Sequence, residues 1–512
     1  MSTRGSLDVV GTGFRLAGHV TPETRSRIRA AERVFDLCAD PVTSAWLQEQ
    51  GPPVESLHDA YAPGRHRLDT YEEMVERMLA PVREGRRVCA AFYGHPGVFV
   101  HPAHAAVRRA RAEGHAACML PGISAEDCLF ADLEVDPTRH GCANFEATDF
   151  IVRPRSVDVR SALVLWQVGG IGVLTYQRAS LWSRQGLRVL VEVLSRHYPA
   201  DHRVVLYEAS PFPIVPPTIL RVRLDALAGS AVTLGTTLYV PPLGDDREAP
   251  AEPPAPDGRS TAAGTLVVAG IGHGGADRVT PYALSWMRHA DRLFVHSEDA
   301  DTVHWLRTVN ASATPVPAPG DDPSPGAGSS PIVDPVLATL GTGRTVCVAV
   351  DGHPAVGMPV VRELVRRARA AGHRAQLLPA ISAADCLYAE LGVDPGASGC
   401  QLVAAGQFAA DGHRVDTATP LIVLRAGAPD PSTGGSMTGP LSRRLSALYP
   451  PAHRVALVEG ADGPADAPRV EWIPLADLPA ARAAPGATLY LPAMGEAAMD
   501  EDALRQLGLA LG

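Results

Sequence analysis

The chain contains no lysine, because all 46 of its basic residues are arginines. This absence excludes Schiff-base chemistry at a lysine and a phosphate-binding loop built around one. The eight cysteines form no CxxC pair and follow no regular spacing, so neither a disulfide scaffold nor a structural zinc site is expected. No uninterrupted apolar run reaches the roughly 18 residues of a membrane-spanning helix. We therefore expect a reduced, membrane-free protein.

The remaining composition is that of a folded protein with several packing units. At 512 residues, the chain is long enough for about three or four domains of ordinary size. Acidic residues outnumber basic ones by 56 to 46, which leaves a formal charge of −10 and no broad basic surface for nucleic acid or anionic lipid. The first residues, MSTRGSLDVVGTG, lack the apolar core of a signal peptide. We expect a cytoplasmic protein that binds neither nucleic acid nor membrane.

An internal repeat organises the sequence. Residues 88–142 and 346–400 align without a gap and are identical at 31 of 55 positions. The likeness continues towards the start of each half, where residues 7–46 parallel residues 266–305. Between the halves lies a stretch rich in proline, alanine and charge, without periodicity. The predicted domains are a first unit over 1–243, a linker over 244–264 and a second unit over 265–512.

Each unit reads as an α/β structure. Short β-branched runs alternate with stretches of helical period, as in Val88–Phe92, Pro102–Glu113 and Ala116–Leu120. This alternation predicts a largely parallel sheet. The sequence Thr21-Pro22-Glu23 provides an N-cap, a first-turn proline and a carboxylate, and so predicts a helix over about 22–31.

A glycine-rich turn follows the first expected strand, Leu7–Val10. Gly11-Thr12-Gly13 lets backbone approach a ligand closely, although a plain turn would have the same sequence. The pattern is not a Rossmann fingerprint, because Leu16 stands where the third glycine belongs and the next helix begins only near Thr21.

Two longer motifs are more specific. They are FYGHPGVF over residues 92–99 and LPGISAEDCL over residues 120–129. Here the chain resembles the tetrapyrrole (corrin/porphyrin) methylase superfamily of S-adenosyl-L-methionine-dependent enzymes. It is most similar to the borosin peptide α-N-methyltransferases, which methylate backbone amides of a ribosomally made precursor peptide. The likeness spans the first unit from Leu7 to Pro242 and, more weakly, the second unit.

The resemblance implies a class III methyltransferase fold, with two αβα subdomains in each unit and the methyl donor in the cleft between them. S-adenosyl-L-homocysteine would be the product. Aromatic and apolar walls around a sulfonium, with a few polar groups, suit such a ligand, although Ser124 and Gln167 taken singly could be ordinary buried polar residues. The positions that match the family's donor site are Tyr93, Gly94, His95, Val98, Phe99, Ser124, Ala125, Gln167, Tyr207 and Ala209.

The same resemblance points to Tyr61, Arg67 and Tyr71 as catalytic residues. An amide nitrogen is a poor nucleophile because its lone pair is delocalised into the carbonyl. A neighbouring guanidinium favours a phenolate and can also hold a developing oxyanion. We expect Tyr71 to be the base, Arg67 the oxyanion stabiliser, and Tyr61 a positioning group or alternate base. Without the resemblance, a surface arginine between two half-buried tyrosines would be the simpler interpretation.

The local sequence also predicts where these residues lie. Asp69-Thr70-Tyr71-Glu72 has the form of a capping box ahead of an apolar-periodic run. This pattern predicts a helix that starts at Asp69, with Tyr71 in its first turn and Arg67 just before it.

A metal site is not expected. His95, His101 and His104 lack an HExxH pattern, and the second unit carries Pro359 and Arg362 opposite the last two. The cysteines are most simply small buried side chains, and no catalytic Cys-His arrangement is readable.

The second unit has lost the groups that the resemblance identifies. Residues 308–343, which correspond to the catalytic stretch, contain no Tyr, Arg or His. Asp351 replaces Tyr93, and Gly357 replaces Phe99. We expect a pseudo-enzyme that completes an intramolecular pseudo-dimer, since the family works as intertwined homodimers; a homodimer of whole chains is the alternative.

Three functions remain open. The first is α-N-methylation of a separate precursor peptide, since the tail over 495–512 reads as a short amphipathic helix rather than as a peptide to be methylated. Tail self-methylation would be a variant of it. The second is methylation of a corrin, porphyrin or other small molecule. The third is a non-catalytic peptide-binding scaffold.

Overall fold

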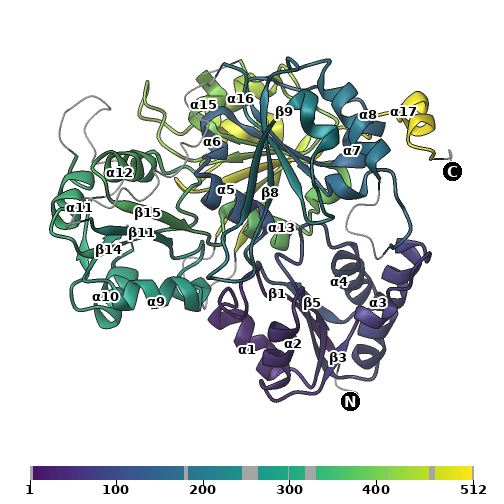
Figure 1. Cartoon of the computed structure of the whole chain (residues 1–512), viewed down its shortest axis with the longest axis horizontal. Helices are drawn as coiled ribbons and strands as arrows, with labels where there is room; N and C mark the ends of the chain where they lie inside the picture. The colour runs from purple at the N-terminus through teal and green to yellow at the C-terminus, as the bar shows by residue number, and fades with distance from the viewer. Residues whose placement is uncertain are drawn as a thin grey trace.

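The computed structural model describes residues 4–177, 183–244, 263–297, 299–317, 330–410, 412–460 and 468–509. Two units lie side by side and share a central sheet, with one smaller sheet on either side of it (Figure 1). Residues 245–262, most of the predicted linker, lie outside the described residues. Among the described residues, no helix has the length and apolar character needed to cross a bilayer.

The first subdomain of unit one is a five-stranded parallel sheet in the order β3-β2-β4-β1-β5. Parallel neighbours require crossover connections, and helices supply most of them, as the sequence predicts. Thr21 caps the first helix, its Oγ1 accepting from the backbone N of Thr24 at 3.1 Å. The elements are β1 (Ser6–Gly11), α1 (Pro22–Ala30), β2 (Arg33–Leu37), α2 (Pro41–Gln48), β3 (Val54–Ser56), η1 (His58–Ala60), α3 (Arg67–Arg83), β4 (Arg87–Phe92), α4 (His101–Ala112), β5 (Ala116–Met119), α5 (Ala125–Leu133) and α6 (Pro137–His140).

The first subdomain of unit two repeats this plan in the order β13-β12-β14-β11-β15. Its sheet is also parallel throughout. The elements are β11 (Thr265–Gly270), η4 (Ala276–Arg278), α9 (Pro281–His289), β12 (Arg292–His296), α10 (Ala300–Val309), β13 (Thr314–Pro315), α11 (Val333–Leu340), β14 (Thr345–Val350), α12 (Pro359–Ala370), β15 (Arg374–Leu378), α13 (Ala383–Leu391) and α14 (Pro395–Ser398).

The second subdomains of both units merge into one mixed sheet, β19-β18-β20-β17-β16-β6-β7-β10-β8-β9. Unit one contributes β6 (Cys142–Glu146), α7 (Ala147–Val152), β7 (Ala162–Trp166), η2 (Val168–Gly170), α8 (Arg184–Leu194), β8 (Arg203–Glu208), β9 (Thr218–Arg223), η3 (Leu224–Gly229) and β10 (Thr237–Val240). Unit two contributes β16 (Cys400–Ala404), α15 (Ala405–Ala410), β17 (Leu421–Leu424), α16 (Thr438–Leu445), β18 (Arg454–Glu459), β19 (Arg469–Pro474), η5 (Leu475–Ala480), β20 (Thr488–Leu491) and α17 (Glu501–Gln506).

The two units meet at a seam with approximate twofold symmetry. Strands β6 and β16 pair antiparallel, with Ala143 opposite Gln401. A histidine of each unit also makes the same hydrogen bond to a backbone carbonyl of the other unit. Nε2 of His95 lies 2.9 Å from the carbonyl oxygen of Asp385, and Nε2 of His353 lies 2.9 Å from the carbonyl oxygen of Asp127.

A second pair of contacts repeats the symmetry. The backbone N of Phe99 donates to Asp394 Oδ1, and that of Gly357 donates to Asp136 Oδ1, both at 3.0 Å. Equivalent residues thus make equivalent bonds across the seam.

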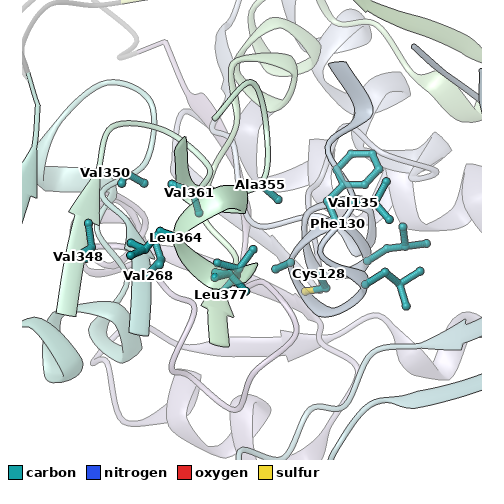
Figure 2. Packing of buried hydrophobic residues seen from close by; sticks show 14 of the residues in the cluster. Cys128, Phe130, Val135, Val268, Val348, Val350, Ala355, Val361, Leu364 and Leu377 are labelled. Atoms are coloured by element: carbon teal, nitrogen blue, oxygen red, sulfur yellow. The ribbon is translucent and has the colours of Figure 1, made fainter. Parts of the chain in front are cut away.

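The largest hydrophobic cluster also crosses from one unit to the other. Figure 2 shows side chains from the first subdomain of unit two, among them Val268, Val348 and Leu364, extending towards Cys128 and Phe130 on α5 of unit one. All of these side chains are buried. Since burial of apolar surface is the main favourable term in folding, each unit depends on the other for part of its core.

Buried carboxyl groups line the seam. The side chains of Asp127 and Asp385 hydrogen bond to each other, and burial raises the pKa of both, that of Asp385 to about 6. Glu126 is also buried and accepts a hydrogen bond from Nδ2 of Asn144 at 2.9 Å. Burial, strengthened by the nearby Asp385 and opposed by Asn144, raises the pKa of Glu126 to about 8.

Glu126→Gln is expected to make the stability of the protein less dependent on pH. Because the pKa of Glu126 is higher in the folded protein than its ordinary value of 4.5, folding favours the protonated acid. Its contribution is fully present below pH 4.5 and is lost as the pH rises to about 8. The variant should therefore gain thermal stability relative to the wild type over this range. Thermal unfolding at several pH values measures the difference, and exposed Glu84→Gln is the control. Parallel pH curves for wild type and Glu126→Gln would contradict the assignment.

Candidate active site

Helix α3, which carries two of the three predicted catalytic residues, starts earlier than the sequence predicts. It begins at Arg67, and its N-cap is His66, whose Nδ1 accepts from the backbone N of Leu68 at 3.2 Å. The predicted cap at Asp69 is therefore wrong. An imidazole rather than a carboxylate makes the capping contact, so Arg67 is the first helical residue and Tyr71 lies in the second turn.

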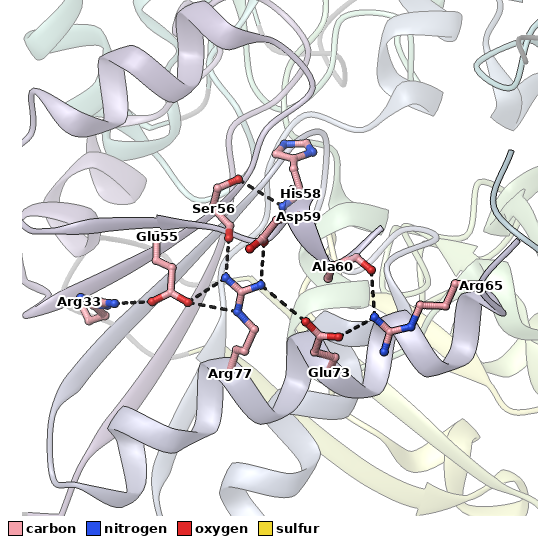
Figure 3. Close-up of polar contacts among 9 residues, drawn as sticks. All are labelled: Arg33, Glu55, Ser56, His58, Asp59, Ala60, Arg65, Glu73 and Arg77. Carbon is pink, nitrogen blue, oxygen red and sulfur yellow. Dashed lines mark hydrogen bonds and ion pairs between the residues drawn. The ribbon is translucent and has the colours of Figure 1, made fainter. Parts of the chain in front are cut away.

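A polar network fixes the segment that leads to Tyr61. Figure 3 shows Arg77 of α3 at its centre, donating to Glu55, to Asp59 and to the carbonyl oxygen of Ser56. The Arg77 Nη1 to Asp59 Oδ1 distance is 2.7 Å. Farther along the segment, Arg65 Nη1 donates to the carbonyl oxygen of Ala60 at 3.1 Å. The segment with Tyr61 is thereby tied to the helix with Tyr71.

A loop of the second subdomain closes over the start of α3. The backbone N of Arg67 donates to the carbonyl oxygen of Leu174 at 3.1 Å. Gly64 N donates to Tyr176 O at 3.0 Å, and Tyr176 N donates back to Arg65 O at 3.1 Å. The ring of Tyr176 also contacts that of Tyr61, with centroids 5.2 Å apart. Both subdomains therefore build the site.

The predicted catalytic residues lie together where the two subdomains of unit one meet. Nε of Arg67 donates to the hydroxyl oxygen of Tyr71 at 3.1 Å, and its Nη2 donates to Oε1 of Gln167 at 3.4 Å. Tyr61 and Tyr71 hydrogen bond through their hydroxyl groups. One guanidinium thus links a phenol on α3 to an amide just after β7.

Burial favours the protonated form of the Tyr61 and Tyr93 phenols, because it raises the pKa of both. Burial raises the pKa of Tyr61, and the neighbouring Tyr71 and Tyr93 raise it further against the opposing charge of Arg67. Desolvation of its phenol likewise raises the pKa of Tyr93, although 44% of that residue's surface remains exposed. The pKa of Arg67 is raised in spite of burial, chiefly by Tyr71, with smaller effects of Glu146 and Tyr61.

Two predicted donor-site residues have strained backbones. Phe99 and Gln167 adopt φ angles of 60° and 56°, in the left-handed region that non-glycine residues rarely occupy. Their counterparts in unit two, Gly357 and Arg425, share this conformation. The Phe99 ring packs on Trp166, next to Gln167, with centroids 5.4 Å apart.

Other predicted donor-site residues lie around the glycine turn. Gly94 has a φ of 66°, and a Cβ there would come within 3.0 Å of the Phe14 ring. Phe14 in turn meets Tyr93 edge to face at 6.1 Å. Val98 packs at the edge of a hydrophobic cluster formed mainly by unit two.

His95, Ser124 and Ala125 lie at or beside the seam. His95 is buried there, and burial lowers its pKa to about 3, so its ring is neutral. Ser124 caps α5 in a reciprocal capping box with Asp127. Both residues thus have structural partners that the sequence did not predict, and Ala125 is the first residue of the capped helix.

Tyr207 and Ala209 lie at the end of β8. The Tyr207 hydroxyl donates to Asp132 Oδ2 at 2.7 Å, and the residue is almost wholly buried. Ala209 packs against the large cluster that crosses the seam.

Three further residues of the site were not predicted. Nη1 of Arg15 and the indole Nε1 of Trp166 are buried donors for which no hydrogen-bond partner exists among the described residues. Glu146, at the end of β6, interacts electrostatically with Arg67. All three have changed in unit two, where Gly274, Leu424 and Ala404 occupy the matching positions. Comparison of the two repeats residue by residue would have found them.

The corresponding pocket of unit two is filled by its own side chains. His273, Arg278, Cys386, Val458 and Gly460 line it. Nη1 of Arg278 donates to the carbonyl oxygen of His273 at 2.9 Å and contacts Sγ of Cys386 at 3.1 Å, while its Nε donates to Glu23 of unit one at 3.2 Å. Nη1 and Nε of Arg278 thus have partners, whereas Nη1 of Arg15 has none among the described residues.

The histidines near the site have separate partners. His104 Nε2 lies 2.9 Å from the carbonyl oxygen of Gly97, and the His101 ring stacks on Tyr71 at 5.9 Å. Within the described ranges, no group of three or more His, Cys, Asp or Glu residues is arranged to hold a metal ion.

Comparison with known families agrees with this geometry. The family model for tetrapyrrole (corrin/porphyrin) methylases matches residues 6–210 and 265–464, more than half of the chain. The chain belongs to the tetrapyrrole methylases. The predicted family, fold class and tandem arrangement are thereby confirmed for this tetrapyrrole methylase.

Several curated relatives are fungal proteins. Over 242 residues, the chain is 43% identical to the methyltransferase/ribosomally synthesized cyclic peptide gymnopeptides precursor of Gymnopus fusipes, covering 46% of this chain and 57% of that protein. It is 42% identical over 243 residues to the omphalotin A precursor of Omphalotus olearius, with 46% and 58% covered. It is 39% identical over 245 residues to a methyltransferase/type I borosin cyclic peptide precursor of Serendipita vermifera. That match covers 47% of this chain and 59% of the relative. The chain thus spans little more than half the length of these relatives.

Solved structures of the family are more distant. Uroporphyrin-III-C-methyltransferase from Thermus thermophilus is 22% identical with a TM-score of 0.36, and the match covers 49% of this chain and 98% of that one. A uroporphyrin-III C-methyltransferase from Thermus thermophilus in complex with S-adenosylhomocysteine is 16% identical with a TM-score of 0.33. The match covers 46% of this chain and 96% of that one.

Replacing Gln167 tests the strain in its backbone. Gln167→Gly and Gln167→Ala both remove the contact with Arg67, but only alanine keeps the cost of the left-handed conformation. The glycine variant should be more stable by about 1 kcal/mol. Chemical denaturation measures this difference. The same pair at exposed Gln185 in α8 should give the opposite order, because glycine weakens helices. A more stable alanine variant at position 167 would contradict the argument.

Proposed function

We propose that unit one transfers methyl groups from S-adenosyl-L-methionine to backbone amide nitrogens of a separate, ribosomally made precursor peptide. The observation that carries this proposal is the position of Arg67, which contacts Tyr71 of one subdomain and Gln167 of the other. A guanidinium that holds a phenol suits a substrate that must lose a proton while negative charge develops on a neighbouring oxygen.

The residues divide the reaction between them. Tyr71 acts as the base in its phenolate form: it takes the amide proton and becomes a neutral phenol, and the hydrogen bond from Arg67 holds its oxygen in place. The remaining guanidinium donors of Arg67 hold the peptide carbonyl oxygen as the amide becomes an imidate. Tyr61, whose raised pKa keeps it protonated, orients Tyr71 rather than acting as the base.

Several side chains of unit one have the chemistry that a sulfonium methyl donor would need. S-adenosyl-L-methionine would supply an electrophilic methyl group and leave as S-adenosyl-L-homocysteine. The unpartnered Nη1 of Arg15 suits the carboxylate of such a ligand, and the indole N–H of Trp166 offers a second donor. The exposed ring of Tyr93 offers an aromatic face for the cation. Because unit two lacks these groups and fills its pocket with Arg278, we propose that it is a pseudo-enzyme.

The exposed apolar residues of unit one support the proposal that the substrate is a peptide. Several large apolar side chains of unit one are exposed, at the start of α3 and on loops of both subdomains, and exposed apolar residues can mark interaction surfaces. They are Leu68, Tyr93, Leu174, Phe212, Ile214 and Val215. The relatives are named as methyltransferases joined to cyclic-peptide precursors. The C-terminal residues pack against α7 and its hydrophobic cluster as far as Leu509.

Arg67→Ala and Tyr71→Phe should abolish most peptide methylation while leaving donor binding intact. Loss of an oxyanion donor costs about a hundredfold to a thousandfold in rate. The wild type is co-expressed with a short peptide from a neighbouring reading frame, and added methyl groups are located by tandem mass spectrometry. Calorimetry measures donor binding.

Arg86→Ala is the matched control, because Arg86 is exposed and pairs only with Glu84 among the described residues. Full methylation by Arg67→Ala would refute the assignment. Methylation of a porphyrin or corrin instead of peptide would favour the small-molecule alternative, and methyl groups on the tail in an intact-mass spectrum would favour self-methylation.

We also propose that one chain is the complete pseudo-dimer. The seam already pairs β6 with β16 and encloses a shared core, so no second chain is required. Light scattering should give the mass of a single chain at concentrations used for assays. A stable dimer built through unit one alone would contradict this proposal.

A further inference from the structure

The end of unit two crosses onto unit one close to the candidate active site. Residues 496–509, here called the C-terminal segment, include α17, which lies beside α7 and α8 (Figure 1). Ala503 and Leu504 are buried in the same hydrophobic cluster as Phe150 and Ile171 of unit one. This cluster covers the unit-one part of the ten-stranded sheet and lies apart from the β6–β16 pair.

Polar contacts fix the register of the segment. Asp500 N donates to the carbonyl oxygen of Val152 at 2.7 Å, and Nη1 of Arg153 donates to the carbonyl oxygen of Ala497 at 2.9 Å. Arg153 is itself held by Asp149 of α7 at 2.9 Å. The segment is therefore bound through its backbone as well as through its apolar side chains.

The segment reaches the loop that closes the active site. Leu507 packs on Gly172, where a Cβ would lie 3.3 Å from Cβ of Leu507. Thr148 Oγ1 of α7 also accepts from the Gly172 backbone N at 3.1 Å. Gly172 is thus clamped between α7 and a residue of unit two.

From Gly172 the same loop runs directly to the catalytic arginine. Leu174 accepts from the backbone N of Arg67, and Tyr176 exchanges backbone hydrogen bonds with Gly64 and Arg65. A single five-residue loop, residues 172–176, therefore contacts Leu507 at one end and the backbone of Arg67 near the other.

We propose that the C-terminal segment of unit two is a positioning element for Arg67 of unit one. By packing on Gly172 it restricts the loop over residues 172–176, and the loop in turn fixes the first turn of α3. Its effect on turnover rests on the proposed function, but its effect on the order of the loop does not. Unit two therefore affects the position of Arg67, since it supplies the contact of Leu507 with Gly172, which unit one alone cannot make.

The test detaches the segment without changing the site. Leu504→Asp places a charge in the shared cluster, and deletion of residues 496–512 removes the segment entirely. Arg505→Ala is the matched control, because that exposed side chain pairs only with Glu501 and Asp502 of its own helix among the described residues. Hydrogen exchange is followed in peptides that cover residues 64–67 and 172–176, with peptides from β12 and β14 as an internal reference.

Both detached variants should exchange faster at residues 64–67 and 172–176, with the reference peptides unchanged. In the methylation assay, kcat should fall by roughly tenfold to a hundredfold, as expected for a misplaced catalytic group. Binding of S-adenosyl-L-homocysteine should stay within about twofold, because the segment does not touch the donor-site residues.

Unchanged exchange in both variants would overturn the proposal, and so would faster exchange throughout the chain, which would make the segment a general stabilising element. Local loosening with an unchanged kcat would also overturn it. If the wild type methylates no peptide, the proposed function fails, but local loosening would still support the positioning of Arg67.

Discussion

The antiparallel pairing of β6 with β16 is the interaction on which the rest of the structure depends. It joins two sheets into one and brings α5 and α13 together, so that His95 and His353 can each bond to a carbonyl of the opposite unit. Without it, the apolar face that extends from Val268 to Phe130 would be exposed to water. The arrangement also buries several carboxyl groups, and this burial raises the pKa of Glu126 and of Asp127.

The seam explains why a degenerate repeat would be retained. Unit two contributes a hydrophobic half-core to unit one, the Glu23–Arg278 ion pair and the packing of Tyr282 under Arg15. These contacts need the fold of a methylase but none of its catalytic groups. A repeat can therefore lose Tyr, Arg and Tyr while its strands, capping boxes and left-handed backbone positions remain.

Much of this could be predicted from the sequence because the signals are local. Alternating strands and helices, the Thr21 cap and the repeat itself correspond directly to elements of the structure. The start of α3 could not, since His66 is a rare cap and its backbone is fixed by Thr175, more than a hundred residues away. The seam roles of His95 and Ser124 depend on Asp385 and Asp127, and the motif alone assigned both residues to the donor site. Arg15 and Trp166 could have been singled out as positions at which the two repeats differ, but only the structure shows that each has a buried donor without a partner among the described residues.

Two arginines at different positions of the repeat, Arg278 in unit two and Arg15 in unit one, differ in how many of their donors have partners. In unit two, Arg278 has found a carbonyl, a thiol and a carboxylate, so a ligand would have to displace three existing contacts. In unit one, Arg15 lies beside Asp132 and Tyr207 with one donor unsatisfied, a state that costs free energy until an acceptor arrives.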